Sequence, residues 1–214
     1  MEKLRQQELD NIVKLHEEWL ESDGKKGERA KIIDKNLRHL SLEHVDLTNA
    51  VFSRCDMSNM HISMVNFSRV KFNKVNLDNA NIYKNKINAA ELCDVTLNNT
   101  TFCMTDLSRS YLTEGTDLSK ACLQGTTLHR AKLNKTYYKL TDCSNENTAV
   151  TYCIEDKLVS CGFCNGGKFC KLKEFKDWYY QHYYKDSNVD DILRNRQKLK
   201  AYYAMCIKIL ERIL

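Results

Sequence analysis

The sequence contains no proline and only seven glycines among its 214 residues. Average usage of about 5 % would give roughly ten prolines, so few extended irregular linkers are expected. Scarce glycine leaves little material for a phosphate-binding loop, and Ser-His-Asp, HExxH and paired-carboxylate motifs are lacking. These absences disfavour catalysis, and we expect a protein that is not an enzyme.

Long apolar runs and a strong charge of one sign are also lacking. No apolar run approaches the roughly 18 residues of a membrane-spanning helix. The first ten residues are charged throughout and do not resemble a signal peptide. The net charge of +5 is too mild to indicate nucleic-acid binding by itself. We therefore expect a cytoplasmic protein without a membrane partner.

A strict five-residue period fills the middle of the chain. An apolar residue stands at every fifth position from Leu37 to Leu112, and the phase slips by one residue near Gly115 before the pattern resumes at Leu118 and fades at Tyr138. A second row, two residues earlier, carries mostly small or medium side chains. This period fits neither a helix nor a flat strand. It predicts a solenoid whose five-residue sides each turn two side chains inward and three outward.

Units such as Val45-Asp46-Leu47, Val75-Asn76-Leu77 and Ala131-Lys132-Leu133 resemble the A(D/N)LxX motif of the pentapeptide-repeat family. The resemblance covers about half of the chain. It implies a mainly β fold, namely a right-handed quadrilateral β-helix with four units in each turn. Twenty units then give about five turns, roughly 25 Å long at strand spacing, with Phe52 stacked on Phe72.

The flanking segments predict helices. One face of the first helix is formed by residues at helical spacing, namely Leu9, Ile12, Val13, His16, Trp19 and Leu20, and Asp23-Gly24 ends the helix. An open solenoid end exposes core and strand edges, so this helix is expected to cover it. After the repeat, residues 150–160 predict a strand pair, and residues 173–184 and 189–214 predict helices. We expect an N-terminal helical cap (1–30), a solenoid (31–142) and a C-terminal module rich in cysteine and aromatic residues (143–214).

The C-terminal module contains the main candidate for a metal site. Cys161-Gly-Phe-Cys164 has the spacing of a zinc knuckle, and Cys153 and Cys170, or His182, would complete the ligand set. The alternatives are free cysteines in a cap, or a redox pair that lacks the βαβ context of thioredoxin-like proteins. No other cofactor is expected, although a four-unit turn also brings His39, His44 and His61 near one another.

Two sets of residues are candidates for partner binding. Four units per turn place Arg69, Lys71, Arg109, Arg130 and Lys132 along one edge, interrupted by Glu91 and Asp94. Such an edge suits phosphate or an acidic protein surface, and the alternative is an ordinary solvated surface. The second set is Trp178 and Tyr179, which could stack a base or simply cap the core. A row of asparagines, Asn59, Asn79 and Asn99, is expected to stabilise corners.

Three functional hypotheses follow. The first is a non-enzymatic protein, phage or mobile-element encoded, that modulates a host protein in the host cytoplasm; residues 15–30 and 161–175 resemble the leader and tail of phage pentapeptide proteins. The second is a DNA-mimic-like binder of a topoisomerase or another DNA-binding protein, but the family members that protect gyrase are acidic whereas this repeat is net positive. The third is a small-ligand or zinc-dependent C-terminal module. Homodimerisation through the C-terminal region is also expected, and nucleic-acid binding is the less favoured alternative.

Overall fold

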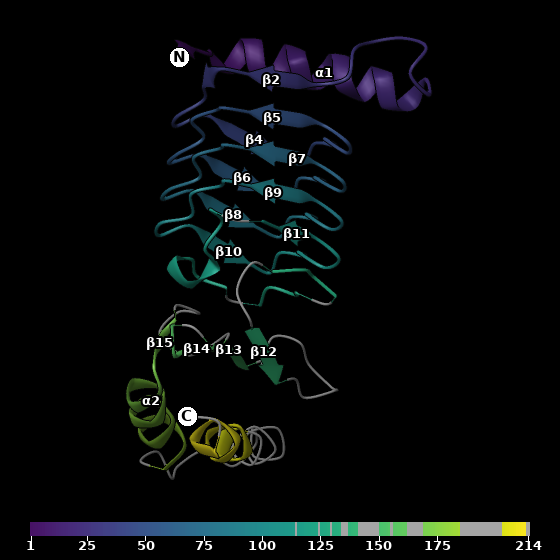
Figure 1. The fold of residues 1–214 in the computed structure, drawn as a ribbon. Helices are drawn as coiled ribbons and strands as arrows, with labels where there is room; N and C mark the ends of the chain where they lie inside the picture. Colours follow the sequence, from purple (N-terminus) through teal and green to yellow (C-terminus); the bar gives the residue numbers. More distant parts are fainter. Residues whose placement is uncertain are drawn as a thin grey trace.

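A computed structural model describes residues 1–113, 115–123, 125–128, 130–133, 137–140, 150–154, 156–161, 169–184 and 203–212. The chain runs from a helix at the top of Figure 1, through a stack of short strands, to the C-terminal helices at the bottom. Buried apolar residues form two clusters. One combines the N-terminal helix with the stack, and the other lies in the C-terminal region.

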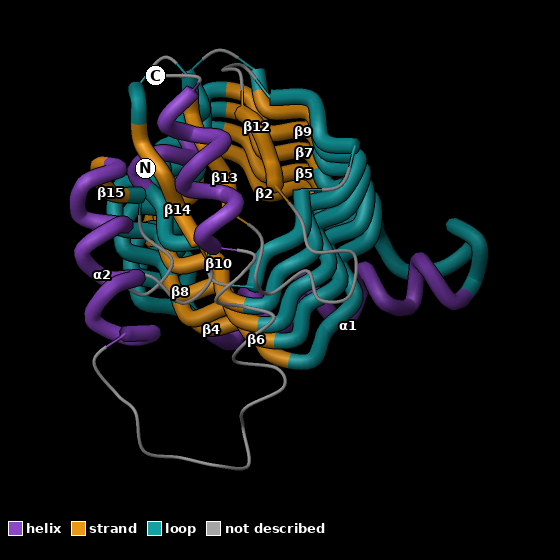
Figure 2. The backbone as a smooth tube through the Cα atoms, turned by 90° about the horizontal axis from the view of Figure 1, so that it is seen from below, coloured by secondary structure: helices purple, strands orange, loops and turns teal. Residues whose placement is uncertain are grey.

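The stack is a β-solenoid, as the five-residue period predicts. Strands one turn apart pair in parallel, for example Val51 with Lys71 and His61 with Asn81. Each turn contains four of the five-residue units, so the solenoid has four sides. Two sides are strands, which form the two sheets on opposite sides of Figure 2. The other two are joined by single bridges such as Asp46 to Asn66.

The strands of the two solenoid sheets are short. The first sheet, in chain order, contains β2 (Lys31–Ile33), β5 (Val51–Ser53), β7 (Lys71–Asn73), β9 (Glu91–Cys93) and β11 (Tyr111–Leu112). The second contains β4 (Ser41–Glu43), β6 (His61–Ser63), β8 (Asn81–Tyr83) and β10 (Thr101–Cys103). The first sheet therefore spans four regular turns.

Each side ends in a residue with left-handed backbone. From Asp34 to Arg109 every fifth residue has positive φ, between +51° and +65°. This conformation costs a non-glycine residue about 1–2 kcal/mol. Hydrogen bonds between turns offset the cost, since the Arg69 N–H donates to Asn88 O at 2.9 Å and the Asn79 N–H to Asn98 O at 2.8 Å. The asparagine row predicted to stabilise corners occupies three of these positions.

The solenoid interior is apolar, with a few polar side chains whose hydrogen bonds are satisfied. The rings of Phe52 and Phe72, in register on neighbouring turns, have centroids 5.3 Å apart, which confirms their predicted stacking. Phe67 meets both of them edge-on. Inward hydroxyls donate to carbonyls of the preceding turn, as Ser110 does to Ile87 O at 2.6 Å. These bonds let threonine and serine replace alanine and valine in the inner row.

The predicted slip is a one-residue insertion. Bridges beyond it join residues that are one position further apart than in the regular turns, such as Thr101 to Cys122 and Tyr111 to Lys132. The left-handed position likewise moves from Arg109 to Gly115, one position beyond the regular step of five. A short 3-10 helix, η1 (Leu118–Lys120), follows. The solenoid therefore continues past its four regular turns with a longer turn.

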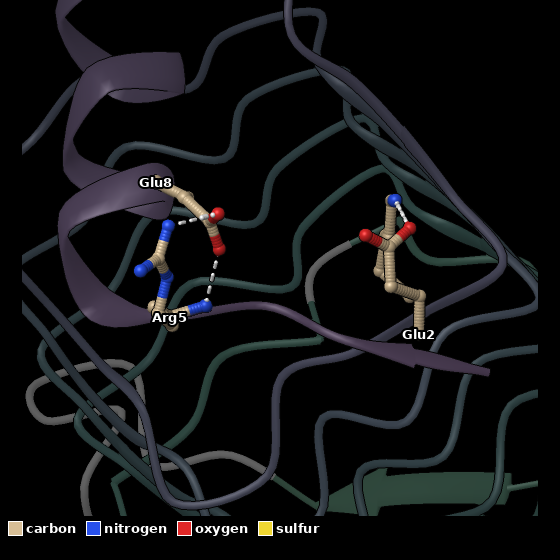
Figure 3. Close-up of polar contacts among 4 residues, drawn as sticks. Glu2, Arg5 and Glu8 are labelled. Carbon is tan, nitrogen blue, oxygen red and sulfur yellow. Dashed lines mark hydrogen bonds and ion pairs between the residues drawn. The ribbon is translucent and has the colours of Figure 1, made fainter.

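Helix α1 (Gln6–Glu21) covers the N-terminal end of the solenoid, as predicted (Figure 1). Leu9 and Val13 join the solenoid core. Figure 3 shows the start of the helix, where Glu8 accepts hydrogen bonds from the Arg5 backbone N–H and guanidinium, both at 2.8 Å. The preceding strand β1 (Glu2–Lys3) pairs with β3 (Lys35–Asn36), and Glu2 forms an ion pair with Lys35.

His16 of α1 fixes the helix to the first turn of the solenoid. Its buried ring accepts a hydrogen bond from the Ala30 N–H through Nδ1, at 3.0 Å. The Nε2 atom therefore carries the proton and donates to Thr48 O at 3.1 Å. Burial lowers the pKa of His16, and the ring is neutral in the folded protein.

The C-terminal region contains an antiparallel sheet and helices. Its strands are β12 (Tyr137–Leu140), β13 (Val150–Cys153), β14 (Leu158–Cys161) and β15 (Cys170–Lys171), followed by α2 (Leu172–Tyr184). The predicted strand pair and the first predicted helix are therefore confirmed. Residues 203–212 are helical, and residues 189–202 of the last predicted helix lie outside the described ranges. None of the described helices is long and apolar enough to cross a bilayer.

Candidate functional site: a basic corner of the solenoid

Repeated corners stack equivalent side chains in columns along the solenoid. One corner column reads Asn49, Arg69, Ala89, Arg109 and Arg130, each with left-handed backbone. The adjoining strand column, at the first residue of β2, β5, β7, β9 and β11, reads Lys31, Val51, Lys71, Glu91 and Tyr111, and a bridge continues it to Lys132. We name the cations of these two columns, together with Arg29, the basic corner: Arg29, Lys31, Arg69, Lys71, Arg109, Arg130 and Lys132.

Hydrogen bonds tie the N-terminal part of the basic corner together. Arg29 Nε donates to Asn49 O at 2.7 Å, and Arg69 Nε donates to Asn49 Oδ1 at 3.0 Å. Both acceptors are neutral, so the two guanidinium charges are not compensated by this contact. Arg29 therefore extends the column one turn beyond Asn49.

The arginines of this corner differ in ion pairing from the other described arginines of the solenoid and its cap. Elsewhere Arg5 pairs with Glu8 at 2.8 Å, Arg38 with Asp56 at 3.9 Å and Arg54 with Asp34 at 2.6 Å. Within the described residues, the four arginines of the basic corner have no carboxylate within ion-pair distance. The one ion pair there joins Lys71 to Glu91 at 2.9 Å.

The columns that flank the basic corner carry charges of both signs. The column three residues before the corner positions reads Asp46, Asn66, Lys86 and Asp106. The corner at the far edge of the first sheet reads Asp34, Arg54, Lys74 and Asp94, and Arg54 forms an ion pair with Asp34. Inside the corner Tyr111 is 46 % exposed, and Lys132 Nζ lies 4.9 Å from its ring centroid. The basic surface is therefore a ridge two columns wide, between columns of mixed charge.

The structure brings together Arg69, Lys71, Arg109, Arg130 and Lys132, as four units per turn require. Their role in binding a partner stays a prediction. Sequence reasoning missed Arg29 and Lys31, because they precede the apolar row that starts at Leu37. Arg29 and Lys31 stand 20 residues, or one turn, before Asn49 and Val51, and this spacing could have placed them in the same two columns.

The aromatic candidates lie elsewhere, in the C-terminal cluster. Tyr179 is only 2 % exposed and belongs to the buried core, and its contact with a partner stays a prediction. Trp178 is partly buried against the same core, stacked on Phe175 with centroids 6.1 Å apart. The contact of Trp178 with a partner stays a prediction, and the described packing of its ring is against the C-terminal core.

The register of the C-terminal sheet bears on the cysteine site. Cys153 pairs with Leu158 and Cys170 with Val159. Because Leu158 and Val159 are consecutive in β14, the two cysteines belong to opposite faces of the sheet. The zinc site that combines both with Cys161 and Cys164 stays a prediction. Cys161 is described only in its backbone pairing, and Cys164 and His182 are not among the residues whose side chains are described.

Other polar groupings do not form a site. His61 Nε2 lies 4.0 Å from Glu43 Oε1, but no set of three His, Cys, Asp or Glu side chains in the described ranges could hold a metal ion. An open groove of about 520 Å³ lies between α1 and the first turn. Its lining includes Asp10, Lys14 and Glu17 but neither histidine nor cysteine. The basic corner is thus the most distinctive surface of the described chain.

Comparison with known proteins agrees with the fold. The family model for pentapeptide repeats matches in eight copies, over residues 34–63, 63–99 and 90–134. Among solved structures, HetL from the cyanobacterium Nostoc sp. strain PCC 7120, a pentapeptide repeat protein involved in heterocyst differentiation regulation, is similar at 21 % identity and a TM-score of 0.33. The match covers 50 % of this chain and 52 % of HetL, so it spans about half of that protein.

Two further solved structures are similar over the same share of the chain. A pentapeptide repeat protein from the Arabidopsis thaliana thylakoid lumen matches at 9 % identity and a TM-score of 0.25, covering 49 % of this chain and 61 % of that one. QnrB1, a plasmid-mediated fluoroquinolone resistance protein, matches at 18 % identity and a TM-score of 0.20, covering 52 % and 67 %. No curated protein matches the sequence.

Proposed function

The repeat segment of this chain, residues 34–134, belongs to the pentapeptide-repeat family, and from that premise we propose that the protein acts by binding another protein, without catalysis. The observation that supports this proposal most directly is the basic corner. Four of its arginines have no carboxylate partner among the described residues, on a scaffold held by hydrogen bonds between turns. Charge presented in this way is suited to an anionic partner.

The finer part of the proposal concerns the partner. We propose that the chain is encoded by a phage or mobile element and that its partner is a host protein, which it binds and modulates in the host cytoplasm. The support is the resemblance of residues 15–30 and 161–175 to leader and tail segments of phage pentapeptide proteins. DNA mimicry is not favoured, because a mimic of DNA needs an acidic surface and the most distinctive surface here is basic.

Recovery of partners from cells tests this function. The full-length chain is immobilised and incubated with a nuclease-treated lysate of the cells in which it is naturally produced. We expect specific proteins to be retained at low salt and released as the salt concentration rises, since exposed charges are screened. Retention of no protein, together with a tightly held small molecule, would contradict the proposal.

Self-association through the C-terminal region is a second part of the proposal. Tyr180 and Met205 are each half exposed in this region, and burial of their apolar surface between two copies would favour association. Sedimentation of the full chain over a wide concentration range tests it. We expect a dimer that Met205→Glu weakens, whereas a monomer at every concentration would exclude it.

A further inference from the structure

We propose that the basic corner binds an acidic α-helix of the partner protein, laid along the solenoid axis. This inference rests on the proposed function, since it assumes a protein partner. It adds the chemistry of recognition: carboxylates on one face of a helix pair with the corner arginines.

The unpaired state of the corner arginines is the first argument. Arg69 uses Nε for the Asn49 side chain, which leaves its two terminal nitrogens for another acceptor. Arg109 and Arg130 form no ion pair with any described residue. Guanidinium groups bind carboxylates with two parallel hydrogen bonds, which are stronger than bonds between neutral groups. A row of carboxylates would therefore supply what Asp34, Asp56 and Glu8 supply to the arginines elsewhere.

The spacing of the arginines matches a helix. Adjacent turns of a β-solenoid are about 4.8 Å apart. Arg69 lies two turns, about 9.6 Å, beyond Arg29, and Arg109 lies two turns beyond Arg69. Arg130 follows Arg109 by one turn. An α-helix places residues i and i+4 about 6 Å apart along its axis and residues i and i+7 about 10.5 Å apart. The difference of about 1 Å per step sums to about 3 Å from Arg29 to Arg130, which the flexible arginine side chains can absorb.

The narrowness of the ridge selects a thin partner. The flanking columns carry charges of both signs, so an anion much wider than the ridge would gain no further net attraction from them. Duplex DNA has phosphates on both edges of a major groove about 12 Å wide, so some of those phosphates would lie over columns that carry no net positive charge. A helix with a single acidic stripe presents its carboxylates only to the arginines.

An exposed ring lies within the same ridge. Tyr111 is held by Lys132 in a cation–π contact and is the exposed aromatic residue of the corner. An aromatic ring of this kind adds apolar contact area, which favours a protein helix with an aliphatic residue beside its acidic stripe.

Labelled helical peptides can test this inference directly. The striped probe is an alanine- and glutamine-based peptide of about 21 residues with glutamates at positions i, i+7, i+14 and i+18, which share one helix face. The control probe has the same composition, with glutamates every five residues and hence spread around the helix. Binding to the full-length chain is measured by fluorescence anisotropy at low and at physiological ionic strength.

Two matched triple variants identify the surface. The corner variant is Arg69→Asn, Arg109→Asn and Arg130→Asn. The control variant, Arg54→Asn, Lys74→Asn and Lys84→Asn, removes the same charge from other corners. All six positions have positive φ, which asparagine tolerates well and already adopts at Asn49, Asn59, Asn79 and Asn99. Thermal unfolding followed by circular dichroism confirms that both variants fold.

We expect the striped peptide to bind the unmodified chain more tightly than the spread peptide, and more weakly as salt rises. The corner variant should lose about tenfold in affinity, and the control variant less than about twofold. Equal binding of the two peptides, or equal losses in the two variants, would overturn the inference. So would tighter binding of a short DNA duplex that the corner variant abolishes, because it would assign the ridge to nucleic acid.

The corner variant also separates this inference from the proposed function. If proteins retained from the lysate remain bound to the corner variant, the proposed function stands and the role of the basic corner is rejected. If the unmodified chain retains no protein, the proposed function itself fails.

Discussion

The side chain of Asp94 occupies the space beside Gly115, one turn further along the solenoid. A Cβ atom on Gly115 would lie 2.3 Å from Asp94 Oδ1 and 3.1 Å from Asp94 Cα. Gly115 also has φ of +87° and is the first corner after the one-residue insertion. Two separate constraints, space and backbone conformation, therefore require glycine where the repeat changes phase.

Gly115→Ala should destabilise the protein by about 2–4 kcal/mol, because it adds a clash to the cost of a left-handed non-glycine residue. Urea unfolding measures the loss. Ala89 is a left-handed alanine in a regular turn, so Ala89→Gly reports the backbone cost alone. A Gly115→Ala loss no larger than the Ala89→Gly gain would show that Asp94 is not an obstacle.

The contact with Asp94 can also be tested by a double variant. Adding Asp94→Ala to Gly115→Ala removes the carboxylate but leaves Asp94 Cα, so part of the lost stability should return. Full additivity of the two single changes in urea unfolding would mean that the two residues do not interact.

His16 should make stability depend on pH near neutrality. Burial lowers the pKa of His16 in the folded protein, whereas the unfolded chain has a pKa of about 6.5. Above pH 7 both states are neutral, and stability is complete. As pH falls below about 6.5 the unfolded state binds a proton first, so the free energy of unfolding should decrease until the folded pKa is reached.

His16→Phe isolates this effect. The variant leaves the Ala30 N–H and Thr48 O without their ring partner, so it should lose about 2 kcal/mol at pH 8. Its stability should also fall less steeply than that of the unmodified chain between pH 6.5 and 5. Parallel pH profiles from urea unfolding would contradict the assignment of that slope to His16.

Asn85 is a buried amide in the inner row and should contribute to stability through its hydrogen bonds. Its Oδ1 accepts from the Val65 N–H at 2.7 Å, and its Nδ2 donates to Ile62 O at 2.9 Å. Asn85→Ala removes both hydrogen bonds and leaves the Val65 N–H and Ile62 O without this partner, so it should lower the free energy of unfolding by about 1–3 kcal/mol. Asn81→Ala, at an exposed position of β8, should change stability by less than about 0.5 kcal/mol. A similar loss in both variants would argue against the role of burial.

Phe67 lies at the centre of the aromatic cluster in the solenoid. Phe67→Ala should destabilise the protein by about 3–5 kcal/mol, because Phe52 and Phe72 lose an edge-on partner and a cavity remains. Phe67→Leu keeps most of the volume and should cost clearly less. Thermal unfolding of the two variants gives the comparison, and near-equal melting temperatures would indicate that the cavity collapses.

The solenoid could be predicted from the sequence because its cause is local. Each apolar residue of the row from Leu37 to Leu112 occupies an equivalent position in the repeat. The period and phase of the row therefore specify which side chains are buried. The slip at Gly115 was visible for the same reason. The left-handed backbone at Arg69, Met64 and similar corners gave no signal, since hydrogen bonds between turns, rather than residue type, hold it there.

The candidate site was predicted in part. The column from Arg69 to Lys132 follows from the period, but the absence of carboxylate partners among the described residues depends on side-chain placement. His16 was expected on the buried helix face, yet its two partners come from Ala30 and Thr48, which only the tertiary fold brings together. Residue type does not reveal that Tyr179 is buried or that Cys153 and Cys170 lie on opposite faces of the sheet, since burial and strand register are properties of the folded chain.

One regular turn of the solenoid is also a unit of length. Inserting or removing a whole turn between Leu47 and Arg109 would move the C-terminal arginines along the axis by one strand spacing, about 4.8 Å, without changing the side they face. Duplication of one turn within a gene would thus change the distance between the first and last arginines of the basic corner in steps of one strand spacing. The longer turn at Gly115 would not serve as such a copy, because its additional residue shifts the phase of everything that follows.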